Sequence, residues 1–130
     1  MGYYSEVGLV LTANGSDKLT LALASTKDDT TRRELEDLLR YADQRIAAPL
    51  GEHAWYWNGI KWYSEFREIT WLESLLQTLA DEDYYFIRIG EDNDDIVVAG
   101  GYWENPFGME LNRSILLCEP KDAAALPAAQ

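Results

Sequence analysis

The chain has 130 residues, of which 47% are hydrophobic, and this length and composition suit one domain with one substantial core. Its 11 Lys and Arg against 23 Asp and Glu give a formal net charge of −12, which argues against direct binding to nucleic acid, because phosphate affinity comes from cationic side chains. Five Trp, eight Tyr and three Phe argue against a disordered acidic protein, because aromatic side chains supply buried area that offsets the entropy of ordering.

Cysteine content and the N-terminal residues indicate the compartment. Cys118 is the single cysteine, so an internal disulfide is excluded and a reducing environment fits. Residues 1–6 have neither a basic region nor a long apolar run, unlike a secretory signal, and no span approaches the ~18 apolar residues of a membrane helix. We therefore expect a cytoplasmic protein that does not bind membranes.

Residues 6–11 are apolar and rich in strand formers, and the Asn14-Gly15 pair after them is typical of a turn, so we expect a buried first strand. Residues 16–24 fit two structures. Leu19, Leu21 and Leu23 alternate as in a hairpin strand, whereas a Ser16 N-cap before an apolar face suits a short helix. We favour the helix.

The next segment has the clearest helical period. Apolar residues fall at i, i+3, i+4, i+7 and i+11, namely Leu35, Leu38, Leu39, Ala42 and Ile46. Thr31 and Glu34 can form a capping box at its start. We expect an amphipathic helix that ends before Pro49.

Residues 55–63 are densely aromatic and are interrupted by Asn58-Gly59, which indicates a short strand and a bend. A third helix is predicted after a Ser64 cap, because an apolar stripe follows. The stripe consists of Phe66, Ile69, Leu72, Leu75, Leu76 and Leu79.

From there the pattern becomes extended. Strands are predicted at 84–89, 96–99 and 109–117, with turns at 90–95 and 105–108. The predicted order β-α-α-β-α-β-β-β implies an α+β fold, with two or three helices packed on one face of a mainly antiparallel sheet of about five strands. We expect one domain over 1–118 and a disordered tail over 119–130.

The sequence offers little material for catalysis. His53 is the only imidazole, and a Cys or Ser nucleophile needs a general base. A zinc site needs about four N or S ligands, and the sequence offers only two such side chains, those of His53 and Cys118. The acidic loop 91–95 contains ligands for a hard cation but lacks the Gly and the bidentate Glu of an EF-hand loop. We expect a protein that is not an enzyme, with no metal site and no cofactor.

Acidic residues flank the predicted strand 84–89. The group before it is Asp81, Glu82 and Asp83, and the group after it is Glu91, Asp92, Asp94 and Asp95. At ~3.3 Å per residue the two groups should lie about 20 Å apart. A further group near a helix start comprises Asp28, Asp29, Glu34, Glu36 and Asp37. If these groups share a face, they could imitate the phosphates of a short duplex; otherwise they are ordinary solvated loops. We predict the seven acids around 84–89 as charge contacts to a partner.

Aromatic residues are the second unusual feature, and core packing is the better account for most of them. Those left over could form a protein-binding patch, because Trp and Tyr dominate interface hot spots. As weaker candidates we name Trp57, Trp62 and Trp103.

Several motifs recur in one group of proteins. They are 3–7 (YYSEV), 55–57 (WYW), 60–63 (IKWY), 86–91 (FIRIGE), 94–96 (DDI) and 103–108 (WENPFG). In these motifs the chain resembles small, mostly uncharacterised proteins of tailed bacteriophages and prophages. The resemblance implies a phage accessory origin and raises the expectation of an inhibitor of bacterial proteins, including inhibitors of the anti-CRISPR kind that resemble DNA in charge.

Three functions follow as hypotheses. The first is a non-enzymatic phage or prophage inhibitor in the bacterial cytoplasm that blocks a basic, nucleic-acid-handling host complex, with a CRISPR effector as the most concrete case. The second is an immunity protein that neutralises a toxin. The third is a small metal-dependent hydrolase that uses the acidic loop 91–95.

Overall fold

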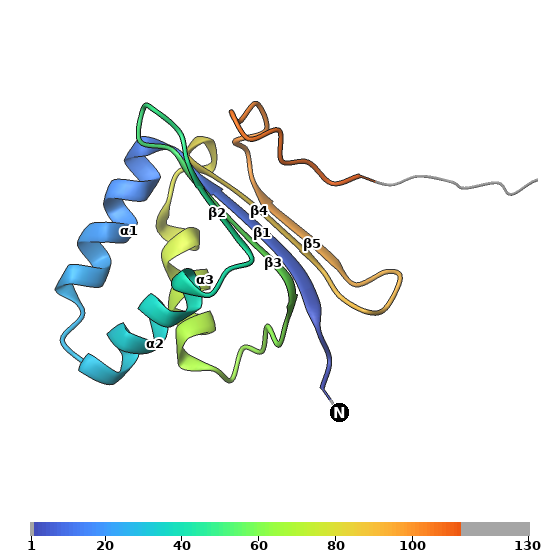
Figure 1. The fold of residues 1–130 in the computed structure, drawn as a ribbon, viewed down its shortest axis with the longest axis horizontal. Coiled ribbons are helices and arrows are strands. Elements are labelled where there is room, and N and C mark those ends of the chain that lie inside the picture. Colours follow the sequence, from blue (N-terminus) through green and yellow to red (C-terminus); the bar gives the residue numbers. More distant parts are fainter. Residues whose placement is uncertain (1, 113–130) are drawn as a thin grey trace, which may run out of the picture.

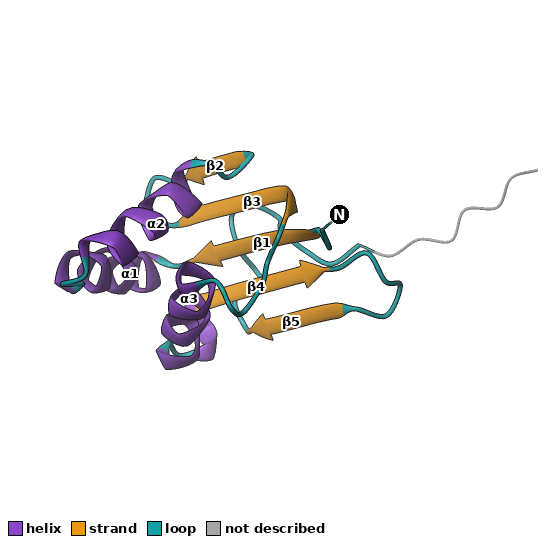
Figure 2. Cartoon of the chain, turned by 90° about the horizontal axis from the view of Figure 1, so that it is seen from below, coloured by secondary structure: helices purple, strands orange, loops and turns teal. Residues whose placement is uncertain are grey.

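In the computed structural model, which describes residues 2–112, five antiparallel strands form one sheet in the order β2-β3-β1-β4-β5. Figures 1 and 2 show the helices on one face of this sheet. The predicted α+β architecture is therefore confirmed. The strands are β1 (Ser5–Leu11), β2 (Gln44–Ala47), β3 (His53–Ile60), β4 (Tyr84–Ile89) and β5 (Ile96–Gly100). The helices are α1 (Ala13–Ser25), α2 (Asp29–Arg40) and α3 (Arg67–Thr78), with a short 3-10 turn η1 (Asp81–Asp83) before β4.

The central strand β1 is apolar throughout because both of its faces are covered. Val7, Leu9 and Leu11 belong to the main core beneath the helices, while Val10 belongs to a smaller cluster on the opposite face. Neighbouring strands β3 and β4 satisfy its two edges. The continuous apolar run that predicted a buried strand is thus explained by burial on both sides.

The segment 16–24 is helical, as we favoured, but α1 begins earlier than the predicted cap. Thr12 is the N-cap, and its side chain accepts a hydrogen bond from the amide of Gly15 at 3.1 Å. Ser16 is instead buried inside the helix, and Asn14-Gly15 lies in the first turn of the helix, so the predicted cap and turn are both wrong. A threonine directly after β1 meets the capping requirement first.

The helix α2 starts after Asp28, whose carboxylate accepts from the amide of Thr30 and from the hydroxyl of Thr31. The predicted capping box is therefore wrong. The helix also ends at Arg40, and Ile46 lies in the edge strand β2, opposite Ala54 of β3. The sequence did not predict β2, because all four of its residues are exposed and only pairing with β3 defines it.

The third predicted helix is confirmed as α3, with Ile69, Leu72 and Leu76 buried in the main core. Its N-cap position is Phe66, and no side chain caps it, so the predicted Ser64 cap is wrong.

After β5 the chain crosses to the face opposite the helices, as Figure 1 shows. Phe107, Met109 and Leu111 pack there on the smaller cluster. A Cβ on Gly8 would lie 2.6 Å from the sulfur of Met109, so the glycine in β1 allows this close approach. The strand predicted at 109–117 is not formed over 109–112. The rest of that prediction, Cys118 and the predicted tail lie outside the described residues.

Among the helices of residues 2–112, none has the length and apolar character needed to cross a membrane.

Candidate functional site

The two acidic groups predicted as charge contacts lie at opposite ends of β4. Asp81 and Glu82 are exposed in η1, which lies directly before the start of β4. Asp92 and Asp94 are exposed in the turn after its end. The two groups are therefore separated by the length of the strand, as the sequence predicted, and do not meet in one continuous cluster.

Asp83 is an internal structural residue. Its side chain is buried and accepts hydrogen bonds from the hydroxyl of Thr12 and from the side-chain amide of Asn14, both at 2.9 Å. Its carbonyl oxygen also accepts from the amide of Thr12 at 3.0 Å. The carboxylate fastens the start of α1 to η1 and is not presented to a partner.

The turn after β4 also uses its acids internally. Asp95 forms an ion pair with Arg88 at 2.8 Å and accepts from the hydroxyl of Tyr3 at 2.7 Å. These hydrogen bonds, from Arg88 first and then from Tyr3, lower the pKa of Asp95. Glu91 accepts from the backbone amide of Tyr4 at 2.7 Å. Of the acids in this turn, Asp92 and Asp94 thus remain for external contacts.

Of the three candidate tryptophans, two are likewise engaged inside the molecule and one is exposed. Trp57 and Trp62 are buried in the main core. The indole of Trp62 donates to the carboxylate of Glu73 at 3.1 Å. Trp103 is 71% exposed, so its ring is accessible to a partner.

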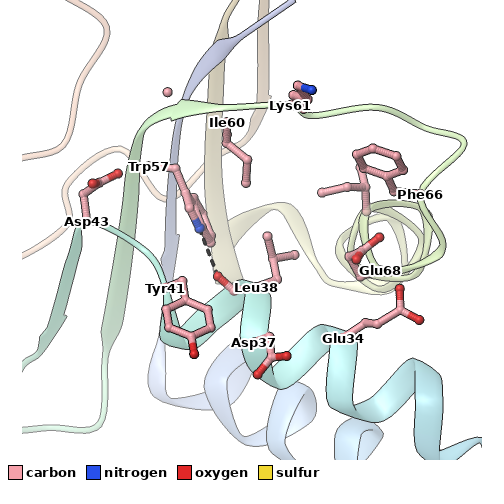
Figure 3. Close-up of a pocket in the computed structure, with 12 residues that line it drawn as sticks. Glu34, Asp37, Leu38, Tyr41, Asp43, Trp57, Ile60, Lys61, Phe66 and Glu68 are labelled. Atoms are coloured by element: carbon pink, nitrogen blue, oxygen red, sulfur yellow. Dashed lines mark hydrogen bonds between the residues drawn. The ribbon is translucent and has the colours of Figure 1, made fainter. Parts of the chain in front are cut away.

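A cleft of about 510 Å³ lies between α2, β3 and α3, as Figure 3 shows. Its volume falls within the range of ~300–1,000 Å³ that is usual for ligand pockets. Residues from all three elements and from the adjoining loops line it. They are Glu34, Asp37, Leu38, Tyr41, Asp43, Trp57, Gly59, Ile60, Lys61, Phe66, Glu68 and Ile69.

The floor of the cleft is apolar and well fixed. Trp57 donates its indole N–H to the carbonyl of Leu38 at 3.0 Å, a bond drawn in Figure 3 that ties β3 to α2. Ile69 of α3 is buried in the same core, and Ile60 packs against it. Because these residues belong to the main core, the floor is preorganised.

Four carboxylates surround this floor. Glu34 and Asp37 come from α2, and each forms an ion pair with an exposed arginine, Glu34 with Arg67 at 3.5 Å and Asp37 with Arg40 at 3.4 Å. The other two are those of Asp43 and Glu68. Asp43 accepts from the backbone amide of Asn58 at 2.7 Å.

The pKa of Glu68 reflects both burial and the concentration of negative charge at this site. Burial raises its pKa, and the neighbouring carboxylate of Glu34 raises it further. Lys61 is the one cation among the lining residues, and its ammonium lies 5.7 Å from the centre of the Tyr4 ring. The lining therefore carries four carboxylates and one ammonium.

Exposed aromatic rings flank the cleft. Tyr41 is 72% exposed and Phe66 is 40% exposed, and Figure 3 shows them at opposite ends of it. In the sequence, Glu34 and Asp37 belong to a predicted acidic group, but the cleft itself was not predicted. Asp43 and Glu68 join that group only through the packing of α2 against β3 and α3.

The lone histidine has a structural environment. The Nδ1 atom of His53 lies 3.0 Å from both the hydroxyl of Ser16 and the carbonyl of Gly51, and its ring stacks on Trp55 at 5.8 Å. Within residues 2–112, no three His, Cys, Asp or Glu side chains are grouped so that they could hold one metal ion.

No protein-family model matches the sequence, and no curated protein and no solved structure is significantly similar to it.

Proposed function

We propose that the protein is a non-enzymatic binding protein whose partner presents a basic surface, and that the acidic cleft between α2, β3 and α3 is its main contact. The observation that carries this proposal is the convergence of Glu34, Asp37, Asp43 and Glu68 around a preorganised apolar floor. Carboxylates at the edge of an apolar, aromatic-flanked depression combine charge selectivity with buried area.

The exposed acids at the two ends of β4 have a different role in this proposal. Asp81, Glu82, Asp92 and Asp94 are solvated, so they act at long range and speed association with a basic partner. Their effect falls with ionic strength, because the Debye length is only about 8 Å at physiological salt.

The partner class follows the sequence-based hypothesis. A basic, nucleic-acid-handling complex of the bacterial cytoplasm, such as a CRISPR effector, fits a protein with a net charge of −12. Inhibition would result if the protein occupied the channel where phosphates bind.

The test is affinity capture with the full chain from infected or lysogenic bacteria at low and high salt. We expect a complex with a basic nucleic-acid channel, captured at low salt, lost at high salt and displaced by duplex DNA. A captured partner without a basic surface, or one that duplex DNA does not displace, would refute the proposal.

A further inference from the structure

We propose that the cleft accepts the side chain of an arginine from the partner, with the aliphatic stem on the apolar floor and the guanidinium among the carboxylates. This inference rests on the proposed function and deepens it, because it names the group that the site recognises.

Charge is the first argument. Glu34, Asp37, Asp43 and Glu68 line the cleft, with Lys61 as the one cation in its lining. Arg40 and Arg67 form ion pairs with Asp37 and Glu34 from the exposed rim, at 3.4 and 3.5 Å, whereas Asp43 and Glu68 form none with the other described residues. An arginine entering the cleft would therefore meet Asp43 and Glu68 directly and would compete with the two rim arginines for Glu34 and Asp37.

The apolar floor selects the kind of cation. A compact, strongly hydrated ion gains nothing from contact with Leu38, Trp57 and Ile60. An arginine does, because its methylene stem packs on apolar surface while its weakly hydrated, planar head donates up to five hydrogen bonds. Carboxylates on different sides of the cleft suit this fork of donors better than the single point charge of a lysine.

The exposed ring of Tyr41 supplies the second feature of an arginine site. It stands at one end of the cleft, and the guanidinium of Arg40 already lies over it, 6.0 Å from the ring centre, so a partner's guanidinium would take the place of Arg40 or use the other face of the ring. At the other end, Phe66 offers apolar surface to the residue next to the arginine. The cleft thus combines an apolar floor, carboxylates around it and an aromatic ring at each end, which together suit a short peptide segment with one arginine.

The inference can be tested without knowing the partner, with N-acetyl-arginine amide as the probe. Its neutral isostere N-acetyl-citrulline amide and N-acetyl-lysine amide are the matched controls. Amide and indole NMR spectra of the full chain report the site, because the Trp57 indole N–H lies in the floor. We expect millimolar arginine to shift the signals of Trp57, Gly59 and Phe66, with weaker shifts from lysine and none from citrulline.

Two further readouts separate recognition from general charge attraction. Binding of a guanidinium should lower the pKa of Glu68, because it offsets the repulsion from Glu34. Glu68→Gln should weaken arginine binding roughly five- to tenfold, as expected for the loss of one hydrogen bond at a site open to solvent. Glu82→Gln removes the same charge from an exposed site outside the cleft and should leave the arginine affinity unchanged.

Equal shifts from arginine and citrulline, equal binding of lysine, or shifts outside the cleft would overturn the inference. No binding of the arginine probe would also overturn it. The proposed function is tested separately, since capture of a basic complex would stand even if the arginine probe failed to bind.

Discussion

The carboxylate of Asp95 accepts two hydrogen bonds from the guanidinium of Arg88, at 2.8 and 3.1 Å. The same carboxylate accepts a third from the hydroxyl of Tyr3, so the N-terminal residues are fastened to the turn between β4 and β5. An acid that the sequence indicated as a free contact is therefore a structural link between two distant segments of the chain.

Asp95→Asn should lower the midpoint of urea unfolding at about pH 7, because the asparagine cannot carry the charge that pairs with Arg88. The folded pKa of Asp95 lies below its ordinary value of 3.8. Its stabilising contribution is therefore fully present above pH 3.8 and is lost as the pH falls through the folded pKa. The difference between wild type and variant should disappear in that acidic range. Asp94→Asn, at an exposed neighbouring site, is the control, and an equal loss in both variants would contradict the assignment.

Asp83→Ala should lower the free energy of unfolding by about 1–2 kcal/mol, because it removes the carboxylate that accepts from the half-buried hydroxyl of Thr12 and from the side-chain amide of Asn14. Chemical denaturation measures this change. Glu82→Ala, one residue away and exposed, should change stability by less than about 0.5 kcal/mol. If both variants lost the same stability, the structural role of Asp83 would be wrong.

Gly8→Ala should cost up to about 1 kcal/mol, because its Cβ would lie 2.6 Å from the sulfur of Met109 and that flexible side chain would have to move. The two positions should be coupled by at least ~0.5 kcal/mol in a double-mutant cycle with Met109→Ala. Additive effects would mean that the segment after β5 does not press on Gly8.

Glu68→Gln should be slightly more stable than wild type at about pH 7 and should bind the partner more weakly. The folded pKa of Glu68 lies above its ordinary value of 4.5, so its contribution to stability is present below pH 4.5 and is lost as the pH rises through the folded pKa. The gain on substitution is only a few tenths of a kcal/mol, because the group is largely solvated and screened. A loss of stability at about pH 7 would show that the carboxylate is not under repulsion in the folded state.

Local patterns predicted the α+β architecture well, because periodic apolar residues define most of its elements. The run in β1 and the stripe Ile69, Leu72 and Leu76 in α3 were sufficient to place a strand and a helix. Caps were predicted less well, since Thr12 and Asp28 compete with nearby residues of similar capping ability.

Long-range pairing explains what the sequence could not show. The exposed edge strand β2 exists through its register with β3, and no local apolar pattern indicates it. The cleft likewise depends on long-range packing, which brings Glu68 of α3 beside Glu34 of α2 and adds Asp43 to the same lining. By contrast, Asp83 and Asp95 are no different in type from their neighbours, and only the folded chain shows that both are engaged internally.

The most direct test of the account compares two variants with equal loss of charge. One replaces Glu34, Asp37 and Glu68 in the cleft by their amides, and the other replaces the exposed Asp81, Asp92 and Asp94 by asparagine. We expect the cleft variant to lose capture of the basic complex at physiological salt through faster dissociation, and the exposed variant to keep capture with slower association. Full capture by the cleft variant, or loss only in the exposed variant, would contradict the assignment of the cleft as the binding site.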